Sequence, residues 1–539
     1  MTSPNSKATG IETEATNESR PESEVCRTLS FDAKHLKITQ VQLFDVTDRH
    51  NELVQQNSWL AHRIQPLNLS GNLFLVEDLI QGTCSTIIRQ SPLPNARPIS
   101  TEHDLQIRNK TDGGFEVHLL AGGDTNSDPW VVLESSNDLT ERTSLLHNWQ
   151  RGQRPSTPGH QTPRFLSNTW GDRNRDARIQ HEFIEGEIDS ASKLGVDVVQ
   201  IDDGWQKGIS ANSAEAQTKG GIWDGFWAAD ENFWTPNPDR FPKGLDPLVQ
   251  RAKDQGMGLG LWFVPDPTHD YDNWQRDADC ILGLHNRYGV EHFKIDGVKA
   301  ESQTAFARLN QFVNKVISQS HGKVVLDLDI TAGIRPGYFG MIECGPLFVE
   351  NRYSDWRGYW PHHTMRNLWK LSQWIDPKRM RFEFLNSTRN LEKYANDPLA
   401  PSCYSPATLF ASVMMANPLG WFEVSNLPTP WLDEVSELVH IWRNHRQNIF
   451  SGTILPIGSA PDGVSPTGWV SISQDMKSGF LLLFRELNEQ TSFSLPLNVV
   501  TTKTQWQNLA GCGTIASGEG QIHATIDQPL GFQFSQFSL

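Results

Sequence analysis

Residues 178–205 read RIQHEFIEGEIDSASKLGVDVVQIDDGW, an amphipathic stretch followed by a short apolar run that ends on polar residues. In the first part, 178–195, apolar residues recur three and four positions apart, which predicts a helix, and VDVVQID at 196–202 predicts a buried strand. A helix that leads into such a strand is typical of a parallel sheet with right-handed crossovers. This stretch therefore predicts an α/β fold.

The same alternation of apolar runs and helical stretches continues along the middle of the chain. DPLVQRAKDQG at 246–256, for example, predicts a second amphipathic helix between two apolar runs. The expected strands lie at 165–170, 196–202, 256–265, 291–296, 323–330, 346–351, 380–386 and 412–422. Eight strand–helix units over roughly 280 residues predict a (β/α)8 barrel.

Two regions with strand patterns flank the barrel, which we expect at 160–445. Residues 31–150 hold alternating runs such as LKITQVQLFDV and FEVHLLAGG, typical of a β-sandwich-like domain. Residues 151–164, RGQRPSTPGHQTPR, have the composition of a linker. Residues 450–539, with runs such as GFLLLFREL and GFQFSQF, predict an antiparallel β-sandwich.

The composition excludes several classes of protein. The net charge of −16 on 539 residues disfavours contact with nucleic-acid phosphates. No apolar run approaches the ~20 residues of a membrane span. The six cysteines are scattered without a C-x-x-C pair, so neither a zinc site of that kind nor a disulfide framework is expected. Residues 1–30 lack the apolar core of a secretory signal, which predicts a disordered tail and a cytoplasmic protein.

Functional groups of a (β/α)8 barrel gather at the carboxyl ends of the strands. At these ends the sequence places mostly carboxylates, together with two cations and several indoles. They are Trp170, Asp172, Asp202, Asp203, Trp205, Trp262, Asp266, Lys294, Asp296, Asp329, Thr331, Arg352 and Asp355. The 19 tryptophans of the chain fit either core packing or the stacking of sugar rings on indole faces.

Two carboxylates that face each other across a pocket can cleave a glycosidic bond. One must be ionised to attack the anomeric carbon, and the other must be protonated to donate to the leaving oxygen. Lys294 lies two residues before Asp296, on the same face of the expected strand, and favours the ionised form of Asp296. Taken alone, this Lys-x-Asp pattern fits a surface salt bridge better, and IDDGW at 201–205 fits a strand-ending turn equally well.

Together these motifs resemble the clan of retaining α-galactosidases, most closely glycoside hydrolase family 36. The resemblance covers roughly 160–440 and is strongest for LGVDVVQIDDGW at 194–205 and the FWTPNPDRFPKGLDPLVQRAKDQGMGLGLWFVPD that comes after it, similar to the family's second and third barrel units. HFKIDG at 292–297 is similar to the family's nucleophile strand, and ENRYSDW at 350–356 to the strand of its acid/base.

The resemblance implies the roles of the two catalytic carboxylates. Asp296 is expected to be the nucleophile that forms a covalent glycosyl-enzyme. Asp355 is expected to be the general acid and then the general base for water. In a retaining enzyme of this kind, two such carboxyl groups lie about 5–5.5 Å apart or somewhat more. The expected activity is the removal of terminal α-galactosides, with no cofactor and no metal.

The resemblance also implies which residues bind the sugar. Asp202 and Asp203 would hold the 4- and 6-hydroxyls of a galactose-like ring, and Lys294 would contact the 3- and 4-hydroxyls. Trp262 would line the pocket, and Arg352 would reach toward the 2-hydroxyl. The remaining residues expected at the substrate are Trp170, Trp205, Asp329 and Thr331.

Two stretches depart from the family pattern. WFVPD, with Val264 and Asp266, stands where the family usually has Trp-x-Glu-Pro-Glu. DITAGIRPG at 329–337 replaces a Cys-Ser-Gly-Gly-Gly-Arg stretch that faces the 2-substituent and the leaving group. Asp329, Thr331 and Arg335 in this loop leave two alternatives open: an α-N-acetylgalactosaminidase, or a galactosyl transferase of the raffinose synthase type.

Two hypotheses that assign the chain to another functional class are weaker. A non-catalytic sugar-binding protein would not need both Asp296 and Asp355. A metal-dependent enzyme is disfavoured because Lys294 lies among the acids and a histidine-rich ligand set is missing; His362 and His363 are expected to be structural residues at a helix start. The expected partner is an oligosaccharide or glycoside, without nucleic acid or membrane, and the state of assembly, monomer or homo-oligomer, stays open.

Overall fold

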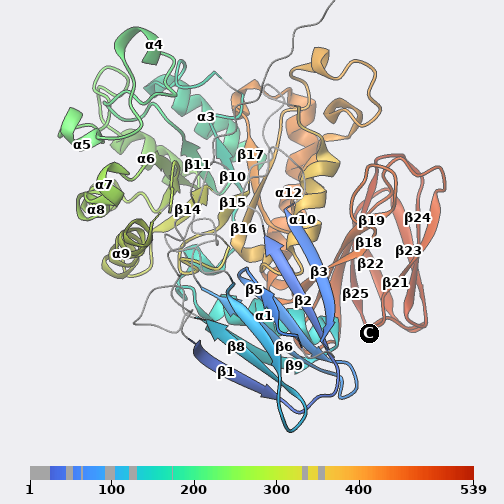
Figure 1. Cartoon of the computed structure of the whole chain (residues 1–539). Helices are drawn as coiled ribbons and strands as arrows, with labels where there is room; N and C mark the ends of the chain where they lie inside the picture. The colour runs from blue at the N-terminus through green and yellow to red at the C-terminus, as the bar shows by residue number, and fades with distance from the viewer. Residues whose placement is uncertain are drawn as a thin grey trace, which may run out of the picture.

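The computed structural model describes residues 25–43, 53–61, 65–90, 103–120, 130–172, 174–300, 302–329, 338–349 and 358–539. Figure 1 shows a central barrel surrounded by helices, with a group of strands near the N-terminus in blue and another near the C-terminus in red. Among the described helices, none is long and apolar enough to cross a membrane. The predicted fold class, a (β/α)8 barrel flanked by two β regions, is confirmed.

Eight parallel strands close the barrel in the order of the sequence. They are β10 (Leu166–Asn168), β11 (Val198–Ile201), β12 (Gly258–Phe263), β13 (His292–Ile295), β14 (Val325–Asp329), β15 (Leu347–Val349), β16 (Met380–Phe384) and β17 (Asn417–Trp421). Apart from Gly258, every residue of these strands is buried. Burial on both faces explains why each strand reads as an apolar run in the sequence.

The helices outside the barrel present apolar faces to the strands. The longer ones are α3 (His181–Leu194), α6 (Asp246–Asp254), α8 (Trp274–Tyr288), α9 (Gln303–Gln319), α10 (Pro361–Leu371) and α12 (Thr429–Ser451); α2 (Pro158–Gln161), α4 (Ala216–Lys219), α5 (Phe226–Ala229), α7 (Thr268–Tyr271) and α11 (Pro406–Ala411) are short. In α3, Ile184, Ile188 and Ala191 form the buried stripe expected from the sequence. Gly195, with a φ of 84°, ends this helix in the left-handed conformation.

Two antiparallel sheets precede the barrel. One has the order β1 (Val25–Phe31), β8 (Phe115–Leu120), β7 (Leu105–Asn109), β4 (Leu67–Leu69); the other has the order β3 (Val54–Ala61), β2 (Leu36–Leu43), β5 (Leu73–Asp78), β6 (Thr83–Arg89), β9 (Trp130–Ser136). All of β1 except its last residue lies within 1–30, the range expected to be a disordered tail. It is ordered because Leu29 and Phe31 pack against the core between the sheets while β1 pairs with β8.

The C-terminal region is also built of two antiparallel sheets. The larger has the order β18 (Thr453–Gly458), β19 (Thr467–Ile472), β20 (Ser478–Phe484), β25 (Phe532–Ser538), β22 (Gln505–Gly511); the smaller has the order β21 (Ser492–Pro496), β24 (Gln521–Ile526), β23 (Gly513–Gly518). Leu481, Leu483, Ile522 and Phe537 are among the side chains buried between them. α12 packs against β18, β19, β20 and β22 and so attaches these sheets to the barrel.

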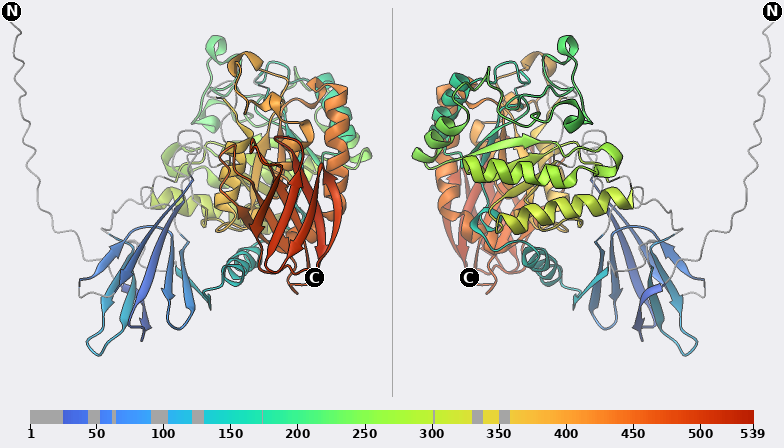
Figure 2. Two further views of the ribbon diagram at one scale, coloured as in Figure 1. Left: turned by 90° about the vertical axis from the view of Figure 1, so that its right-hand side faces the viewer. Right: turned by 90° about the vertical axis from the view of Figure 1, so that its left-hand side faces the viewer.

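A helix that the sequence analysis did not predict joins the three parts. α1 (Leu139–Gly152) begins at Asp138, whose side chain caps it by accepting a hydrogen bond from the backbone N–H of Glu141 at 2.9 Å. It packs against β6, β9 and β18, and in both views of Figure 2 it lies between the N-terminal sheets and the rest of the molecule. Its buried face includes Leu146 and Gln150.

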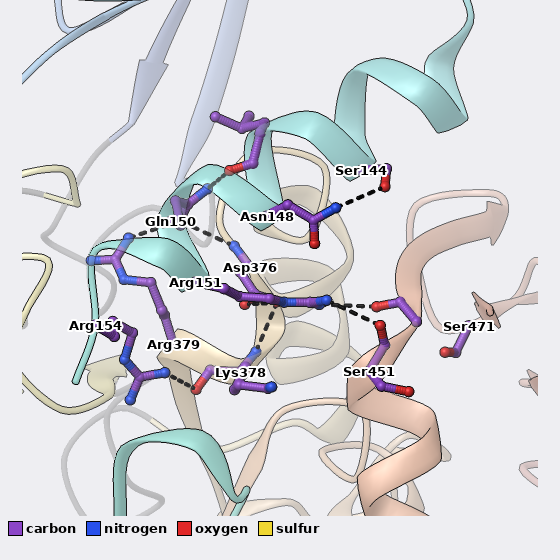
Figure 3. A network of polar contacts seen from close by, with 12 residues as sticks. Ser144, Asn148, Gln150, Arg151, Arg154, Asp376, Lys378, Arg379, Ser451 and Ser471 are labelled. Atoms are coloured by element: carbon purple, nitrogen blue, oxygen red, sulfur yellow. Dashed lines mark hydrogen bonds and ion pairs between the residues drawn. The ribbon is translucent and has the colours of Figure 1, made fainter. Parts of the chain in front are cut away.

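The last turn of α1 enters a buried polar network (Figure 3). Arg151 donates to both carboxylate oxygens of Asp376, at 2.8 and 2.9 Å, and to the carbonyls of Ser451 and Gly452. Gln150 accepts from the fully buried Arg379 at 2.8 Å. Burial disfavours the charge of Asp376, yet the Arg151 guanidinium holds the pKa of this carboxyl well below its usual range.

We predict that Asp376→Ala lowers the free energy of unfolding by about 3–5 kcal/mol at pH 7, because Arg151 then keeps a largely buried charge without its counterion. Asp376 has a lowered pKa in the folded state, so its contribution is present at neutral pH and is lost as the pH falls below about 4. Urea unfolding of wild type and variant at pH 7 and at low pH measures the difference.

The matched control is Arg287→Ala, which breaks an exposed ion pair with Asp246 and should change stability much less. An equally small effect for Asp376→Ala would show that the network does not hold the parts of the chain together.

Candidate active site

The ammonium of Lys294 lies among three carboxylates at the carboxyl end of the barrel. Its Nζ donates to Asp202 Oδ2 at 3.1 Å and lies 3.8 Å from a carboxylate oxygen of both Asp296 and Asp329. These residues stand at the ends of β11, β13 and β14, and β12 lies between β11 and β13, so parallel pairing brings them to the same end of the barrel. The structure thus assembles four of the residues that strand-end counting selected.

Aromatic rings line the other side of Lys294. Its Nζ lies 4.8 Å from the ring centroid of Trp421 on β17 and 5.6 Å from that of Phe348 on β15. Both rings are buried inside the barrel. They exclude water from the ammonium and offer it their negative ring faces. The sequence analysis placed Trp421 in a strand but did not select it for the site.

Asp296 is the most exposed of the three carboxylates around Lys294. Its side chain is 16% exposed, compared with 3% for Asp202 and 4% for Asp329. Trp262 Nε1 donates to one oxygen of Asp296 at 3.1 Å, and the backbone N–H of Gly297 donates to the other at 2.6 Å. These donors and Lys294 stabilise the carboxylate form and fix its direction. Asp296 is therefore the carboxylate that a ligand reaches most easily.

Asp202 is held in place by the strand before it. Asn168 on β10 donates through Nδ2 to Asp202 Oδ2 at 2.7 Å, and the backbone N–H of Asp202 donates to Thr169 Oγ1 at 3.1 Å. The same Oδ2 accepts from Lys294. Asn168 is therefore a positioning residue for the site, which the sequence analysis did not select.

Asp203 points into its own loop and not toward Lys294. Gln206 donates to one of its oxygens at 2.6 Å, and the hydroxyl of Ser210 donates to the other. Burial raises the pKa of Asp203 to about 7, with the nearby Asp176 and Asp202 acting in the same direction. Of the two acids in IDDGW, only Asp202 lies beside Lys294, and the sugar contact of Asp203 stays a prediction.

The turn after Asp203 needs a glycine. Gly204 has a φ of +111°, and a Cβ at this position would lie 2.4 Å from the Cβ of Asp176. Arg240 bridges the two sides, since its guanidinium donates to the carbonyl of Gly204 and to Asp176 at 2.9 Å each. The turn is therefore consistent with both interpretations of IDDGW, as a strand-ending turn and as a sugar-binding motif.

Three other residues from the strand ends have structural contacts. Trp205 is fully buried and donates to the carbonyl of Trp262 at 2.8 Å, which supports the strand end that holds Trp262. Trp170 is 7% exposed and packs inside the barrel. Asp266 is fully buried and accepts hydrogen bonds from Gly225 and Thr268. Sugar contacts of Trp170 and Trp205 stay predictions.

Trp223, which was not among the predicted site residues, lies next to Trp262 and Gly297. Trp223, which is partly exposed, meets Trp262 edge-on with the ring centroids 6.2 Å apart. Its ring is 3.7 Å from where a Cβ on Gly297 would lie, so Gly297 allows a close approach. Trp223 comes from the long excursion between β11 and α6, and the only signal for it was the cluster of indoles in GIWDGFW.

Four predicted site residues lie outside the described part of the chain: Thr331, Arg335, Arg352 and Asp355. Their predicted roles therefore stay predictions. Among the residues that the structure does describe, no group of three or more His, Cys, Asp or Glu side chains could hold a metal ion.

Comparison with known proteins agrees with this geometry. Residues 125–321 match the protein family described as Melibiase. An α-galactosidase of Escherichia coli is 26% identical over 199 residues, which are 34% of this chain and 25% of the relative. α-Galactosidase 2 of Pediococcus pentosaceus is 30% identical over 177 residues, 32% of this chain and 21% of the relative. The aligned part is therefore about a quarter or less of each relative's length.

Solved structures share the whole fold. The family GH36 α-galactosidase AgaA of Geobacillus stearothermophilus matches with a TM-score of 0.67 and 13% identity, covering 95% of this chain and 76% of that one. A variant of AgaA in complex with raffinose matches with a TM-score of 0.66, the same identity and the same coverage. At this level of identity the likeness concerns the fold alone.

We predict that Lys294→Met lowers the free energy of unfolding by about 3–5 kcal/mol at pH 7, because Asp202, Asp296 and Asp329 lose the cation that they share. Urea unfolding at pH 7 measures this, with the exposed Lys299→Met as a control. A loss no larger than that of Lys299→Met would contradict a role of Lys294 as the shared counterion.

Proposed function

We propose that this chain is a glycosidase that removes terminal α-galactosyl residues, with retention of anomeric configuration. The observation that carries the proposal is the accessible carboxylate of Asp296, which is held by Trp262, Gly297 and Lys294 at the carboxyl end of the barrel. The match of residues 125–321 to the Melibiase family and the α-galactosidase relatives support the choice of sugar.

The groups around Asp296 suit the recognition of a hydroxylated ring. Lys294 Nζ and the oxygens of Asp202 and Asp329 lie 3.1–3.8 Å apart, so they can donate to and accept from neighbouring hydroxyls. Trp262 contacts Asp296, Trp223 packs edge-on against Trp262, and the two rings offer apolar surface to the C–H groups of a sugar. Variants of AgaA have been solved in complex with raffinose and with stachyose, which supports an oligosaccharide as the substrate here.

In the proposed reaction, a carboxylate oxygen of Asp296 attacks the anomeric carbon and forms a covalent glycosyl-enzyme. The bond from this carbon to the leaving oxygen breaks, its electron pair goes to that oxygen, and Asp355 supplies the proton. Asp355 then removes a proton from water, the water oxygen bonds to the anomeric carbon, and Asp296 leaves as a carboxylate. Two inversions give net retention. Trp262 and Gly297 stabilise Asp296 before the attack and after its release.

We predict that Asp296→Asn lowers kcat for 4-nitrophenyl α-galactoside to background, because an amide oxygen cannot replace the carboxylate as nucleophile. The matched control is Asp272→Asn, an exposed aspartate that pairs with Arg308 at 2.8 Å and should keep normal turnover. Substantial turnover by the Asp296 variant would refute its proposed role.

For Asp355→Ala we predict a loss of rate that depends on the leaving group. A glycoside with an alkyl leaving group needs protonation by the acid and should lose about 10²–10⁴-fold in kcat/KM. A 2,4-dinitrophenyl glycoside needs little protonation and should lose far less. A uniform loss over both substrates would contradict the role of general acid.

Because DITAGIRPG departs from the family pattern, the same assay should also test two related activities. Turnover of 4-nitrophenyl N-acetyl-α-galactosaminide in preference to the galactoside would indicate an α-N-acetylgalactosaminidase. Formation of a trisaccharide when sucrose is added as an acceptor would indicate transfer. We expect hydrolysis of the galactoside to dominate.

A further inference from the structure

A polar cavity lies at the opposite end of the barrel from Lys294. Its volume is about 460 Å³, and residues at the amino ends of β10, β11, β12, β13 and β14, or just before them, surround it. Its polar and charged lining includes Arg164, Asp197, Lys253, Glu291, His292 and Lys323. Because substrate sites of this barrel type lie at the carboxyl ends of the strands, the proposed reaction does not account for this cavity.

The charge of the cavity is positive although the chain as a whole is acidic. Arg164, Lys253 and Lys323 line it together with Asp197 and Glu291. Asp197 is already engaged: Arg446 donates to it, and it accepts from the backbone N–H of Phe165 at 2.9 Å. The net charge of the whole chain is −16. The cavity differs from the rest of the chain because three cations line it and, among its lining carboxylates, only Glu291 is left to oppose them.

Two of these cations, Lys253 and Arg164, have different surroundings at the wall of the cavity. Lys253, at the end of α6, places its Nζ 3.2 Å from where a Cβ on Gly289 would lie, and Gly289 has a φ of +74°. A side chain at position 289 would therefore displace the ammonium. The Nε of Arg164 is buried and has no hydrogen-bond partner among the described residues. Lys253 is exposed and can donate to a ligand in the cavity, whereas the buried Nε of Arg164 lies within the cavity wall.

His292 is the buried polar group at the inner wall of the cavity. Its side chain is 3% exposed, and within the described part of the chain neither ring nitrogen has a hydrogen-bond partner. Burial, together with the positive charges of Arg164 and Arg381, holds the pKa of His292 well below its usual range. The ring is therefore neutral, with one N–H donor and one nitrogen acceptor.

We propose that this cavity binds a small hydroxylated anion of the sugar-phosphate class. Arg164, Lys253 and Lys323 provide the charge-assisted donors that phosphate oxygens need. The carboxylate of Glu291 needs donors, of which a sugar offers several hydroxyls and the inorganic phosphate dianion, HPO4²⁻, only one. A bare phosphate would satisfy the cations but would meet Glu291 with a like charge.

The test is isothermal titration of the full chain with glucose 6-phosphate, inorganic phosphate and glucose in separate experiments. Glucose 6-phosphate should bind with a Kd below about 1 mM and more tightly than either other probe. Lys253→Met, an exposed position that should not affect folding, and Arg164→Gln should each weaken binding by about ten-fold. Lys503→Met in the C-terminal sheets is the control for the loss of one positive charge and should bind as the wild type does.

The site is separate from Asp296, so hydrolysis of 4-nitrophenyl α-galactoside serves as the check on folding, and both variants should retain it. The proposal is overturned if glucose 6-phosphate does not bind, if inorganic phosphate binds as tightly, or if binding survives both Lys253→Met and Arg164→Gln unchanged. These outcomes do not depend on whether the chain hydrolyses galactosides.

Discussion

The ammonium of Lys294 and the three carboxylates around it determine how the end of the barrel is organised. Asp202 and Asp329 are almost fully buried, and such groups are stable as anions only beside a counterion. Lys294 supplies that charge from the middle of the cluster, and the rings of Trp421 and Phe348 exclude water from it. Asp296 is the acid of this cluster that stays accessible. One buried cation thus stabilises the barrel interior and holds the proposed nucleophile.

Much of this arrangement could be predicted from the sequence, because parallel strands buried on both faces read as apolar runs. All eight barrel strands lie where the runs predicted them. Parallel pairing then places the residues at the strand ends side by side, which is why counting from the runs found Asp202, Lys294, Asp296 and Asp329. The positions of the strands alone were enough to predict that these residues lie close together.

What the sequence could not give is the direction of each side chain once a strand has ended. Asp203 follows Asp202 directly, yet it turns to Gln206 and Ser210 because the chain reverses at Gly204. Trp223 reaches Trp262 and Gly297 from a long excursion whose path no periodicity describes. α1 was missed because its buried face contains polar groups such as Gln150 and so lacks a clear apolar stripe. In each case tertiary contacts, and not local pattern, decide the outcome.

The most direct test of Asp296 as the proposed nucleophile is to identify the carboxylate that forms the covalent intermediate. The full chain would be incubated with 5-fluoro-α-galactosyl fluoride, a substrate whose glycosyl-enzyme breaks down slowly, and its peptides would be analysed by mass spectrometry. We predict a fluorogalactosyl adduct on the peptide that contains Asp296, and no adduct in Asp296→Asn. An adduct on Asp202 or Asp329, or an Asp296→Asn variant that is still labelled, would contradict it.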